Sequence, residues 1–370
     1  MKKSKKNTPH PNPIFLSLLI ILSNIVTPSS SQEVAYIPNP RLMSAYIALQ
    51  SWKLAIVSDP LGFTSNWAGP NVCNYTGVYC APAPDNPALL TVAGIDLNHA
   101  DIAGILPEHL GLLRDLALFH INSNRFCGKL PASFLHLKIL HELDVSNNLF
   151  SGPFPYVVLY LPSLKFLDIR FNQFFGEIPP EVFDLPLDAL FLNDNKFKSL
   201  LPVNLGNSPV SVLVLANNLV TGCIPPSVAQ MAETLDEIIL ANLGLTGCLR
   251  PEIGELKELK VLDLSCNKLV GPLPDSIGGM VSLEQLDVGH NKFSGPIPRG
   301  ICLLPKLENF VYAFNYFTSE PAECGRLRDG NDDRKNCIVG RPRQRSAAEC
   351  ALVGANPVDC LLAGSICPFE

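Results

Sequence analysis

Beyond its first 32 residues, the sequence lacks any run of about 18 apolar residues, which is what a membrane-spanning helix requires. Charged residues are also scarce, at 17% of the 370 residues, against about 25% in typical domains. With 47% hydrophobic residues, the chain is not a disordered polyelectrolyte. It contains no GxSxG, HExxH or glycine-rich phosphate loop, and no two cysteines have CxxC spacing. We therefore expect no catalysis, no bound metal and no cofactor.

The first 32 residues have the features of a secretory signal. Four lysines, at positions 2, 3, 5 and 6, precede an apolar stretch from Ile14 to Val26 that is too short to cross a bilayer. Serines at positions 29–31 provide the small residues of a cleavage site. We therefore expect residues 1–32 to be removed and the protein to be secreted. An uncleaved signal anchor is the alternative.

Removing residues 1–32 makes the chain clearly acidic. That segment holds four of the 28 basic residues and none of the 34 acidic ones, so 24 basic residues remain against 34 acidic ones, a net charge of −10. Such a body repels nucleic acid, and it attracts basic partners. Plain solubility is the alternative explanation of the charge. Export from the cell also makes the 12 cysteines candidates for disulfides.

The sequence repeats with a period of about 24 residues. LHELDVSNNLFSGPFP, which begins at Leu140, recurs as LKFLDIRFNQFFGEIP, LKVLDLSCNKLVGPLP and LEQLDVGHNKFSGPIP. All follow the pattern LxxLxLxxNxLxGxIP, and ten such repeats extend from about residue 92 to 319. Leu243 interrupts a column of asparagines that contains Asn124, Asn148, Asn172, Asn195, Asn218, Asn267, Asn291 and Asn315. Much of the high proline content, 33 residues, belongs to the recurring IP, LP and FP turns.

This pattern predicts an α/β solenoid, a plant-type leucine-rich repeat horseshoe of about ten repeats. The LxL leucines stack from coil to coil and form one continuous core. Each LxL segment becomes a short strand of a parallel sheet that lines the concave face. The asparagine turns inward and bonds buried backbone groups. We expect a signal peptide at 1–32, a helical N-terminal cap at 33–91, the repeats at 92–320 and a cysteine-rich C-terminal cap and tail at 321–370.

Cysteines are concentrated in the caps. In the N-terminal cap we pair Cys73 with Cys80, and at the other end Cys302 with Cys324 on the neighbouring coil. Cys223 and Cys248 each follow a repeat glycine one coil apart, so we also pair them, with two buried thiols as the alternative. We expect Cys127 and Cys266 to be free and part of the core. The pairing among Cys337, Cys350, Cys360 and Cys367 stays open. Asn74 begins the N-x-T sequence NYT and is a candidate glycosylation site.

One strand position between the two inward leucines carries candidate binding residues. Strand alternation points this position towards the concave face. In the middle coils it is apolar, whereas in the outer coils it is acidic, so we expect an apolar patch flanked by carboxylates that binds a peptide. The alternative is that these side chains pack on each other. The candidate residues at this position are Asp96, Asp144, Asp168, Phe191, Val214, Ile239, Asp263 and Asp287, and Asn193, two residues after Phe191, is added as a second concave position. Paired carboxylates also occur in glycosidases, but a residue that recurs in each coil is a feature of the repeat.

Several segments are more specific than the generic repeat. NVCNYTGVYCAP, VAGIDLNHADIAGILPEHLGLLRDLALFHINSNRFCG, SPVSVLVLANN and LPKLENFVYAFNYF resemble the plant leucine-rich repeat extensin family. NDDRKNCIVGRPRQRSAAEC is similar to that family's cysteine-rich hinge, so the resemblance covers about residues 39–360. The family's Ser-Pro-Pro-Pro arrays do not follow the hinge in this sequence. We therefore expect a member without the extensin array, which diffuses or is held in the wall noncovalently.

The resemblance implies a non-catalytic protein of the cell wall or apoplast that acts in wall integrity and growth. It would bind rapid alkalinization factor peptides, which are small basic signals that contain cysteines. The resemblance also implies malectin-like receptor kinases and wall polysaccharide as partners, and a homodimer. One alternative is an inhibitor of a secreted enzyme such as polygalacturonase. Those inhibitors have two disulfides in their front cap, where this chain has only Cys73 and Cys80. Another alternative is a structural wall protein.

Overall fold

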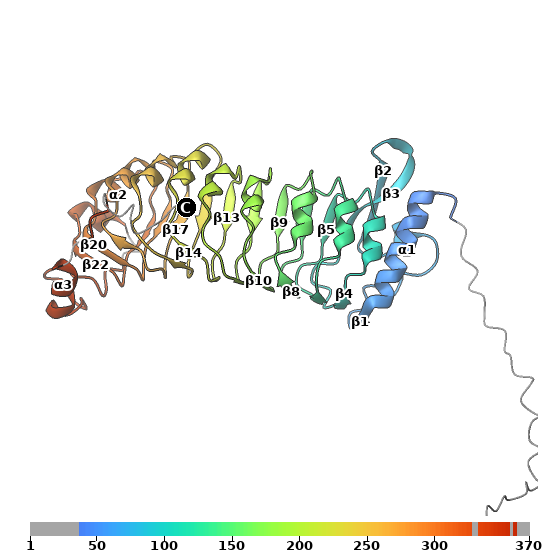
Figure 1. Cartoon of the computed structure of the whole chain (residues 1–370), viewed down its shortest axis with the longest axis horizontal. Helices are drawn as coiled ribbons and strands as arrows, with labels where there is room; N and C mark the ends of the chain where they lie inside the picture. The colour runs from blue at the N-terminus through green and yellow to red at the C-terminus, as the bar shows by residue number, and fades with distance from the viewer. Residues whose placement is uncertain (1–36, 328–331, 356–357, 361–370) are drawn as a thin grey trace, which may run out of the picture. The chain divides into compact units, whose positions relative to one another are not determined.

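The repeated LxL segments form short strands that stack side by side in sequence order from α1 to α3 (Figure 1). The computed structural model describes residues 37–327, 332–355 and 358–360. Its largest sheet joins β2 (Val78–Ala83), which is antiparallel, to ten parallel strands. These are β3 (Asn86–Asp96), β5 (Leu118–His120), β7 (Glu142–Asp144), β9 (Phe166–Asp168), β11 (Ala189–Phe191), β13 (Val212–Val214), β15 (Glu237–Ile239), β17 (Val261–Asp263), β19 (Gln285–Asp287) and β21 (Asn309–Val311). The predicted horseshoe is confirmed.

The core consists of identical repeat positions stacked from coil to coil. Leu143, Val145, Leu167 and Ile169, the inward residues of two neighbouring coils, are fully buried. Aromatic residues stack in the same way, with the rings of Phe174 and its neighbours one coil away 6.3–6.4 Å apart. Each coil therefore buries its apolar residues only against its two neighbours, as in other solenoids.

The asparagine column forms the predicted hydrogen-bond ladder. In a typical coil, Nδ2 of Asn148 donates to the carbonyls of Ile121, Val145 and Ser146 at 2.9–3.2 Å. Its Oδ1 accepts the backbone N–H of Phe126 at 2.9 Å. Asn336 extends the ladder one coil beyond the predicted repeats, where it bonds Tyr312 and Phe317. Leu243 interrupts it and packs against the core instead.

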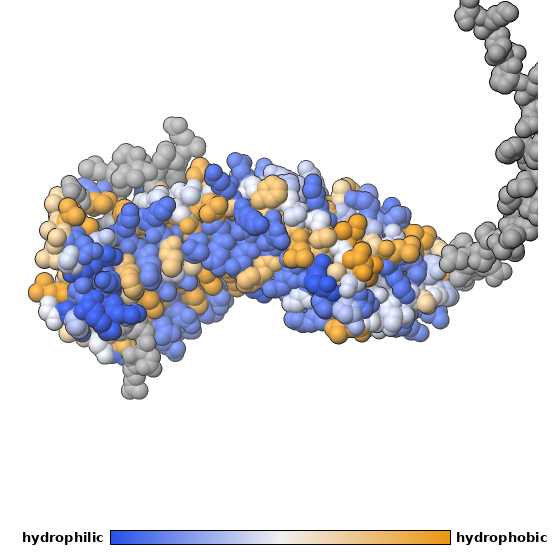
Figure 2. All heavy atoms as spheres, turned by 90° about the horizontal axis from the view of Figure 1, so that it is seen from below, coloured by the Kyte–Doolittle hydropathy of each residue, from blue (hydrophilic) through white to orange (hydrophobic). Residues whose placement is uncertain are grey.

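Lateral strands follow the asparagine position of each repeat and, joined by one strand of the N-terminal cap, form a second series of short sheets. One contains β1 (Ile56–Ser58), β4 (Ala103–Ile105), β6 (Arg125–Gly128), β8 (Leu149–Pro153), β10 (Gln173–Gly176) and β12 (Lys196–Phe197). The others pair β14 (Thr221–Gly222) with β16 (Gly244–Leu245), and join β18 (Val270–Gly271), β20 (Lys292–Pro296) and β22 (Tyr316–Ser319). The view from below in Figure 2 shows polar and apolar residues mixed on the surface. The lateral strands contribute exposed apolar residues such as Ile105, Leu149 and Phe175.

Short helical turns complete the coils on the convex side, most of them directly after the repeat proline. They are α2 (Arg299–Cys302) and the 3-10 turns Glu108–Leu112, Ala132–His136, Tyr156–Tyr160, Pro180–Asp184, Val203–Asn207, Pro226–Met231, Pro251–Glu255, Asp275–Gly279 and Ala322–Arg326. Proline suits the start of such a turn because it has no N–H that would need a partner. Within the described residues, no helix is long and apolar enough to cross a membrane.

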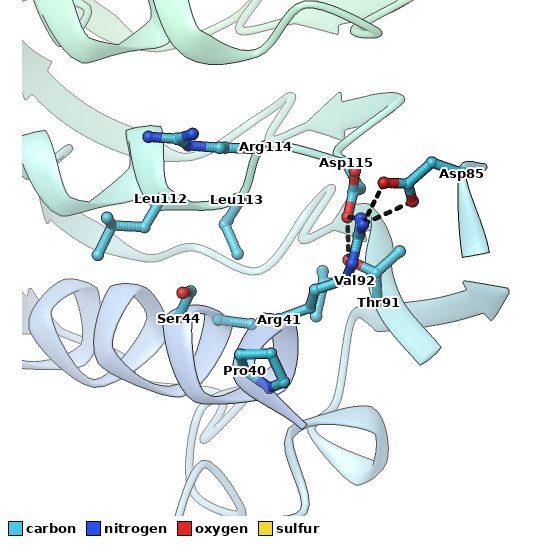
Figure 3. Close-up of a pocket in the computed structure, with 11 residues that line it drawn as sticks. Pro40, Arg41, Ser44, Asp85, Thr91, Val92, Leu112, Leu113, Arg114 and Asp115 are labelled. Carbon is cyan, nitrogen blue, oxygen red and sulfur yellow. Dashed lines mark hydrogen bonds and ion pairs between the residues drawn. The ribbon is translucent and has the colours of Figure 1, made fainter. Parts of the chain in front are cut away.

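The helix α1 (Pro40–Ala55) covers the first coil, with Leu49 and Trp52 fully buried as the sequence pattern predicts. Arg41 ties the helix to the sheet. Its Nη2 lies 2.5 and 2.7 Å from the two Asp85 carboxylate oxygens, and its Nη1 bonds Asp115 (Figure 3). A cavity of about 510 Å³ opens beside this group. Because Arg41 and both acids are already paired, we assign this cavity no ligand.

The cap disulfides agree with two of the predicted pairs. Cys73 bonds Cys80, beside the 3-10 turn Val72–Asn74, and Cys302 bonds Cys324. In the tail, Cys337 bonds Cys350 in α3 (Ala347–Gly354), which settles part of the open pairing. The side chain of Ser346 accepts a bond from the Glu349 N–H and caps the start of α3. Cys367 lies outside the described residues.

The predicted pair of Cys223 with Cys248 is wrong, because Cys248 bonds Cys360 and ties the tail to the lateral strands. Cys223 is also disulfide-bonded. The lateral strands of neighbouring coils are offset by two residues. Cys127, the third residue after Asn124, therefore pairs with Leu149, the first residue after Asn148. Equal repeat positions such as 223 and 248 therefore do not lie opposite each other. Cys248 lies opposite Val270 instead.

Cys127 and Cys266 are free as expected, but both are exposed rather than buried in the core. Cys127 occupies a position of β6 between the buried Phe126 and Gly128, and strand alternation points its side chain outward. Cys266 precedes Asn267 in a left-handed backbone conformation, with φ +58°. This tight bend aims Asn267 into the core, so its predecessor stays at the edge.

Candidate functional site

The concave sheet brings eight of the nine predicted binding residues into a single row. Strand pairing places Asp96, His120, Asp144 and Asp168 side by side, and the row continues through Phe191, Val214, Ile239, Asp263 and Asp287. Asn193 belongs to the next row, two residues further along its strand. Aspartates therefore lie on both sides of an apolar middle, in the predicted order, with His120 among the first of them and Val311 of β21 beyond Asp287.

Each aspartate of the row uses one carboxylate oxygen to shape the backbone. Oδ1 accepts the N–H of the residue two positions later, at 2.8–3.0 Å in all five coils. This bond holds the chain as it leaves the strand and turns towards the ladder asparagine. The second oxygen, Oδ2, is not needed for this turn. It is therefore the atom of each aspartate that remains for other interactions.

The five carboxyl groups differ in exposure although they occupy one repeat position. Asp96 is exposed, Asp144, Asp263 and Asp287 are half-buried, and Asp168 is only 1% exposed. Burial, together with the carboxylate of Asp144 on the neighbouring strand, raises the pKa of Asp168 to about 7. Burial also raises the pKa of Asp287 to about 6, with Asp263 adding to the effect. Asp168 and Asp287 therefore titrate close to neutral pH.

The middle of the row is less accessible than the sequence pattern suggests. Val214 and Asn193 are 9% and 8% exposed, whereas Phe191 and Ile239 are half-buried. The reason is contact between neighbouring strands, since the ring of Phe191 lies 5.6 Å from that of Phe166. The apolar part of the surface is therefore a narrow strip, and the carboxylates are its main polar feature.

Three residues in or beside the row, His120, Glu142 and Arg170, were not predicted as binding residues from the sequence. His120 occupies the gap between Asp96 and Asp144, and its Nε2 lies 3.0 Å from Oε2 of Glu142. Arg170 lies two residues after Asp168, with Nε 3.0 Å from Oδ2 of Asp168. Because same-face residues are two apart on a strand, the positions two before and two after each aspartate would have indicated Glu142 and Arg170.

Asn74, the candidate glycosylation site, lies at the end of a 3-10 turn in the N-terminal cap. The residue is exposed, as is Thr76, whereas Tyr75 between them is buried. An exposed acceptor asparagine is a requirement for an attached sugar. Glycosylation of Asn74 stays a prediction.

Family models match three parts of the chain. The leucine rich repeat N-terminal domain matches residues 46–81, and two leucine rich repeat models match residues 163–185 and 233–293. These matches cover the front cap and part of the repeats.

Solved structures with the same fold include peptide-hormone receptors. One is the Arabidopsis receptor kinase HAESA in complex with the peptide hormone IDA and the co-receptor SERK1, at 27% identity and a TM-score of 0.63, covering 81% of this chain and 53% of that one. Another is the plant peptide hormone receptor RGFR1 in complex with RGF2, at 27% identity and a TM-score of 0.57, covering 67% and 43%. A plant ice-binding protein, 24% identical, has a TM-score of 0.67 over 84% of this chain and 96% of its own. The fold alone therefore does not select a function.

Sequence relatives are more specific. Leucine-rich repeat extensin-like protein 6 of Arabidopsis thaliana is 67% identical over 325 residues, 88% of this chain and 69% of that protein. Leucine-rich repeat extensin-like protein 3 of the same plant is 68% identical over 87% of this chain, but this match spans only 42% of that protein. Identity of this level over 88% of the chain and 69% of the relative shows that the chain belongs to the leucine-rich repeat extensin-like family.

Proposed function

We propose that this protein is an extracellular, non-catalytic leucine-rich repeat protein that binds a small basic peptide on its acidic concave face. The observation that carries this proposal is the row of five aspartates, each of which uses Oδ1 for the backbone, while Oδ2 is not needed for the turn and in Asp168 faces Nε of Arg170. A row of carboxylate oxygens along a concave sheet suits a ligand with several cationic side chains. The ligand class that we propose is the rapid alkalinization factor type of peptide, which is basic and contains cysteines.

Charge and fold support this choice. The net charge of −10 beyond residue 32 draws a basic ligand to the surface and raises its association rate at low salt. Two neighbours in fold, HAESA and RGFR1, are bound to peptide hormones in their solved structures. Family membership adds the cell wall as the proposed location, malectin-like receptor kinases and wall polysaccharide as further proposed partners, and a homodimer as the proposed assembly.

Calorimetry with the full chain, made in a secretory host, and a synthetic, oxidised rapid alkalinization factor peptide tests the proposal. In the test variant, Asp96, Asp144 and Asp263 are each changed to asparagine, which keeps Oδ1 for the backbone but removes the charge. Exposed ion pairs are worth about 0.2–1 kcal/mol each, so we expect roughly a tenfold loss of affinity. Binding should also weaken as salt is added.

A matched control removes three charges from the convex side through Glu181→Gln, Glu255→Gln and Asp275→Asn. All three residues are exposed and belong to convex turns. If the control loses as much affinity as the concave variant, net charge rather than the concave row is responsible. Absence of any heat with folded wild-type protein at micromolar peptide would refute the proposed function.

A further inference from the structure

A cationic side chain of the protein itself, Arg170, already contacts one carboxylate of the acidic row. Arg170 is the only lysine or arginine at the row position, or two residues before or after it, from β3 to β21. Its Nε lies 3.0 Å from Oδ2 of Asp168. Its guanidinium carbon lies 4.9 Å from the centre of the Phe191 ring on the adjacent strand. The chain therefore shows which group this part of the surface accepts, a guanidinium beside a carboxylate and over an aromatic ring.

The fit of Arg170 is poor in spite of these short distances. Among the described residues, seven buried side-chain nitrogen or oxygen atoms have no well-aligned hydrogen bond. Three of them lie on or just after the paired strands β9 and β11, namely Oδ2 of Asp168, Nε of Arg170 and Oδ1 of Asn193. Asp168 and Asn193 are both more than nine-tenths buried. Two buried acceptors without an aligned donor are costly, and a donor-rich group of a ligand satisfies both.

We infer that Arg170 is an internal competitor, which occupies the sub-site where a cationic side chain of a basic ligand binds and is displaced by that side chain. The inference rests on the proposed function for the identity of the ligand. The Arg170 side chain is 37% exposed, so it is free to rotate away from Asp168 into solvent. The incoming cation then meets Oδ2 of Asp168, the ring of Phe191 and Oδ1 of Asn193. Arg170 thereby lowers the affinity of the concave face for the basic ligand.

The competitor role predicts that removing Arg170 raises the affinity for the ligand, whereas other roles of Arg170 predict a lower affinity. If Arg170 contacted an acidic group of the ligand, or merely held Asp168 in place for binding, its removal would weaken binding. If it competes, its removal strengthens binding. The contact of a guanidinium with an exposed aromatic ring is worth about 0.5–1 kcal/mol. Relief of that competition corresponds to roughly a two- to fivefold gain in affinity.

The test compares Arg170→Gln, Arg170→Lys and Arg114→Gln in the full chain by calorimetry, at a pH of about 7.5 so that the carboxyl groups are charged. Arg114 is exposed near the N-terminal cap and gives the same change of net charge. We expect tighter binding for Arg170→Gln, near wild-type binding for Arg170→Lys, which keeps a competing cation, and little change for Arg114→Gln. In an Asp168→Asn background, Arg170→Gln should bring a smaller gain, because the carboxylate charge is gone and only the Phe191 ring remains contested.

Two probes keep this inference separate from the proposed function. The first is the oxidised rapid alkalinization factor peptide, and the second is an amidated hexa-arginine peptide. If Arg170→Gln gains affinity for hexa-arginine while the wild type fails to bind the natural peptide, the competitor role holds and the proposed function fails. Unchanged or weaker binding of both probes by Arg170→Gln overturns the inference, as does an equal gain in Arg114→Gln. Thermal unfolding of each variant confirms that it is folded.

Discussion

The asparagine ladder permits a quantitative prediction about stability. In Asn148→Ala, the three carbonyls that Nδ2 bonds each keep another donor, since Ile121 O also accepts from Asn124, Val145 O from Asn172, and Ser146 O from the Ser123 N–H. The N–H of Phe126 differs, because Oδ1 of Asn148 is its partner and the residue is fully buried. An unsatisfied buried N–H costs about 1–3 kcal/mol. Weaker bonding of the carbonyls and a small cavity add to this.

We therefore expect Asn148→Ala to lower the free energy of unfolding by about 3 kcal/mol, mostly through that one N–H. Urea unfolding followed by circular dichroism measures the change. Asn309→Ala is the matched control, because Asn309 is exposed on the concave face and its side chain forms no hydrogen bond with the described residues. A loss in Asn148→Ala no larger than in Asn309→Ala would refute the role of the ladder. The same substitution at Asn218 or Asn267, the ladder asparagines on either side of Leu243, gives a second comparison of the loss in unfolding free energy.

Two further predictions concern titration and cysteine chemistry. Since burial raises the pKa of Asp168 to about 7, the folded protein holds a proton there that the unfolded chain releases above a pH of about 4. The contribution of Asp168 to stability is therefore full below a pH of about 4 and is lost as the pH rises to about 7. The thermal midpoint of Asp168→Asn should accordingly fall less over this range than that of the wild type. Without reductant, a thiol reagent should label Cys127 and Cys266 of the folded protein, and peptide mapping should find Cys248 joined to Cys360. A free Cys248 thiol would contradict the tail attachment.

The sequence was sufficient wherever structure follows from the repeat itself. The strands, the inward leucines, the asparagine ladder and the row of aspartates all recur every 24 residues or so, and each coil meets only its neighbours. Cys73 and Cys80 are equally local, since they are seven positions apart in the sequence. The bond from Cys248 to Cys360 spans 112 positions and depends on how the tail folds back. The repeat pattern does not specify where the tail folds back. Cys223 was the wrong partner for Cys248 because the lateral strands are offset by two residues per coil, so equal repeat positions do not face each other.

The candidate site shows the same limit on a finer scale. Asp96 and Asp168 occupy one repeat position, yet the first is exposed and the second is buried. The difference arises from neighbours that the repeat does not specify, since Asp168 has Phe191 on the next strand and Arg170 on its own. The prediction that these residues lie side by side is therefore confirmed, whereas the exposure and the pKa of the aspartates differ from coil to coil. The variable positions beside a repeated residue determine which of its copies can bind a ligand.

The aspartates also illustrate how a repeat residue can serve structure and binding with different atoms. Oδ1 holds the turn after each strand, as shown for Asp144 by its bond to the Ser146 N–H at 2.9 Å. Changing an aspartate to alanine or lysine removes both oxygens, so any loss of binding would be confounded by a loosened turn. Asparagine keeps an oxygen for the turn and removes only the charge. At the exposed and half-buried positions such a variant therefore isolates the electrostatic contribution. At Asp168 it also removes the partner of Arg170, so the two side chains there must be varied together.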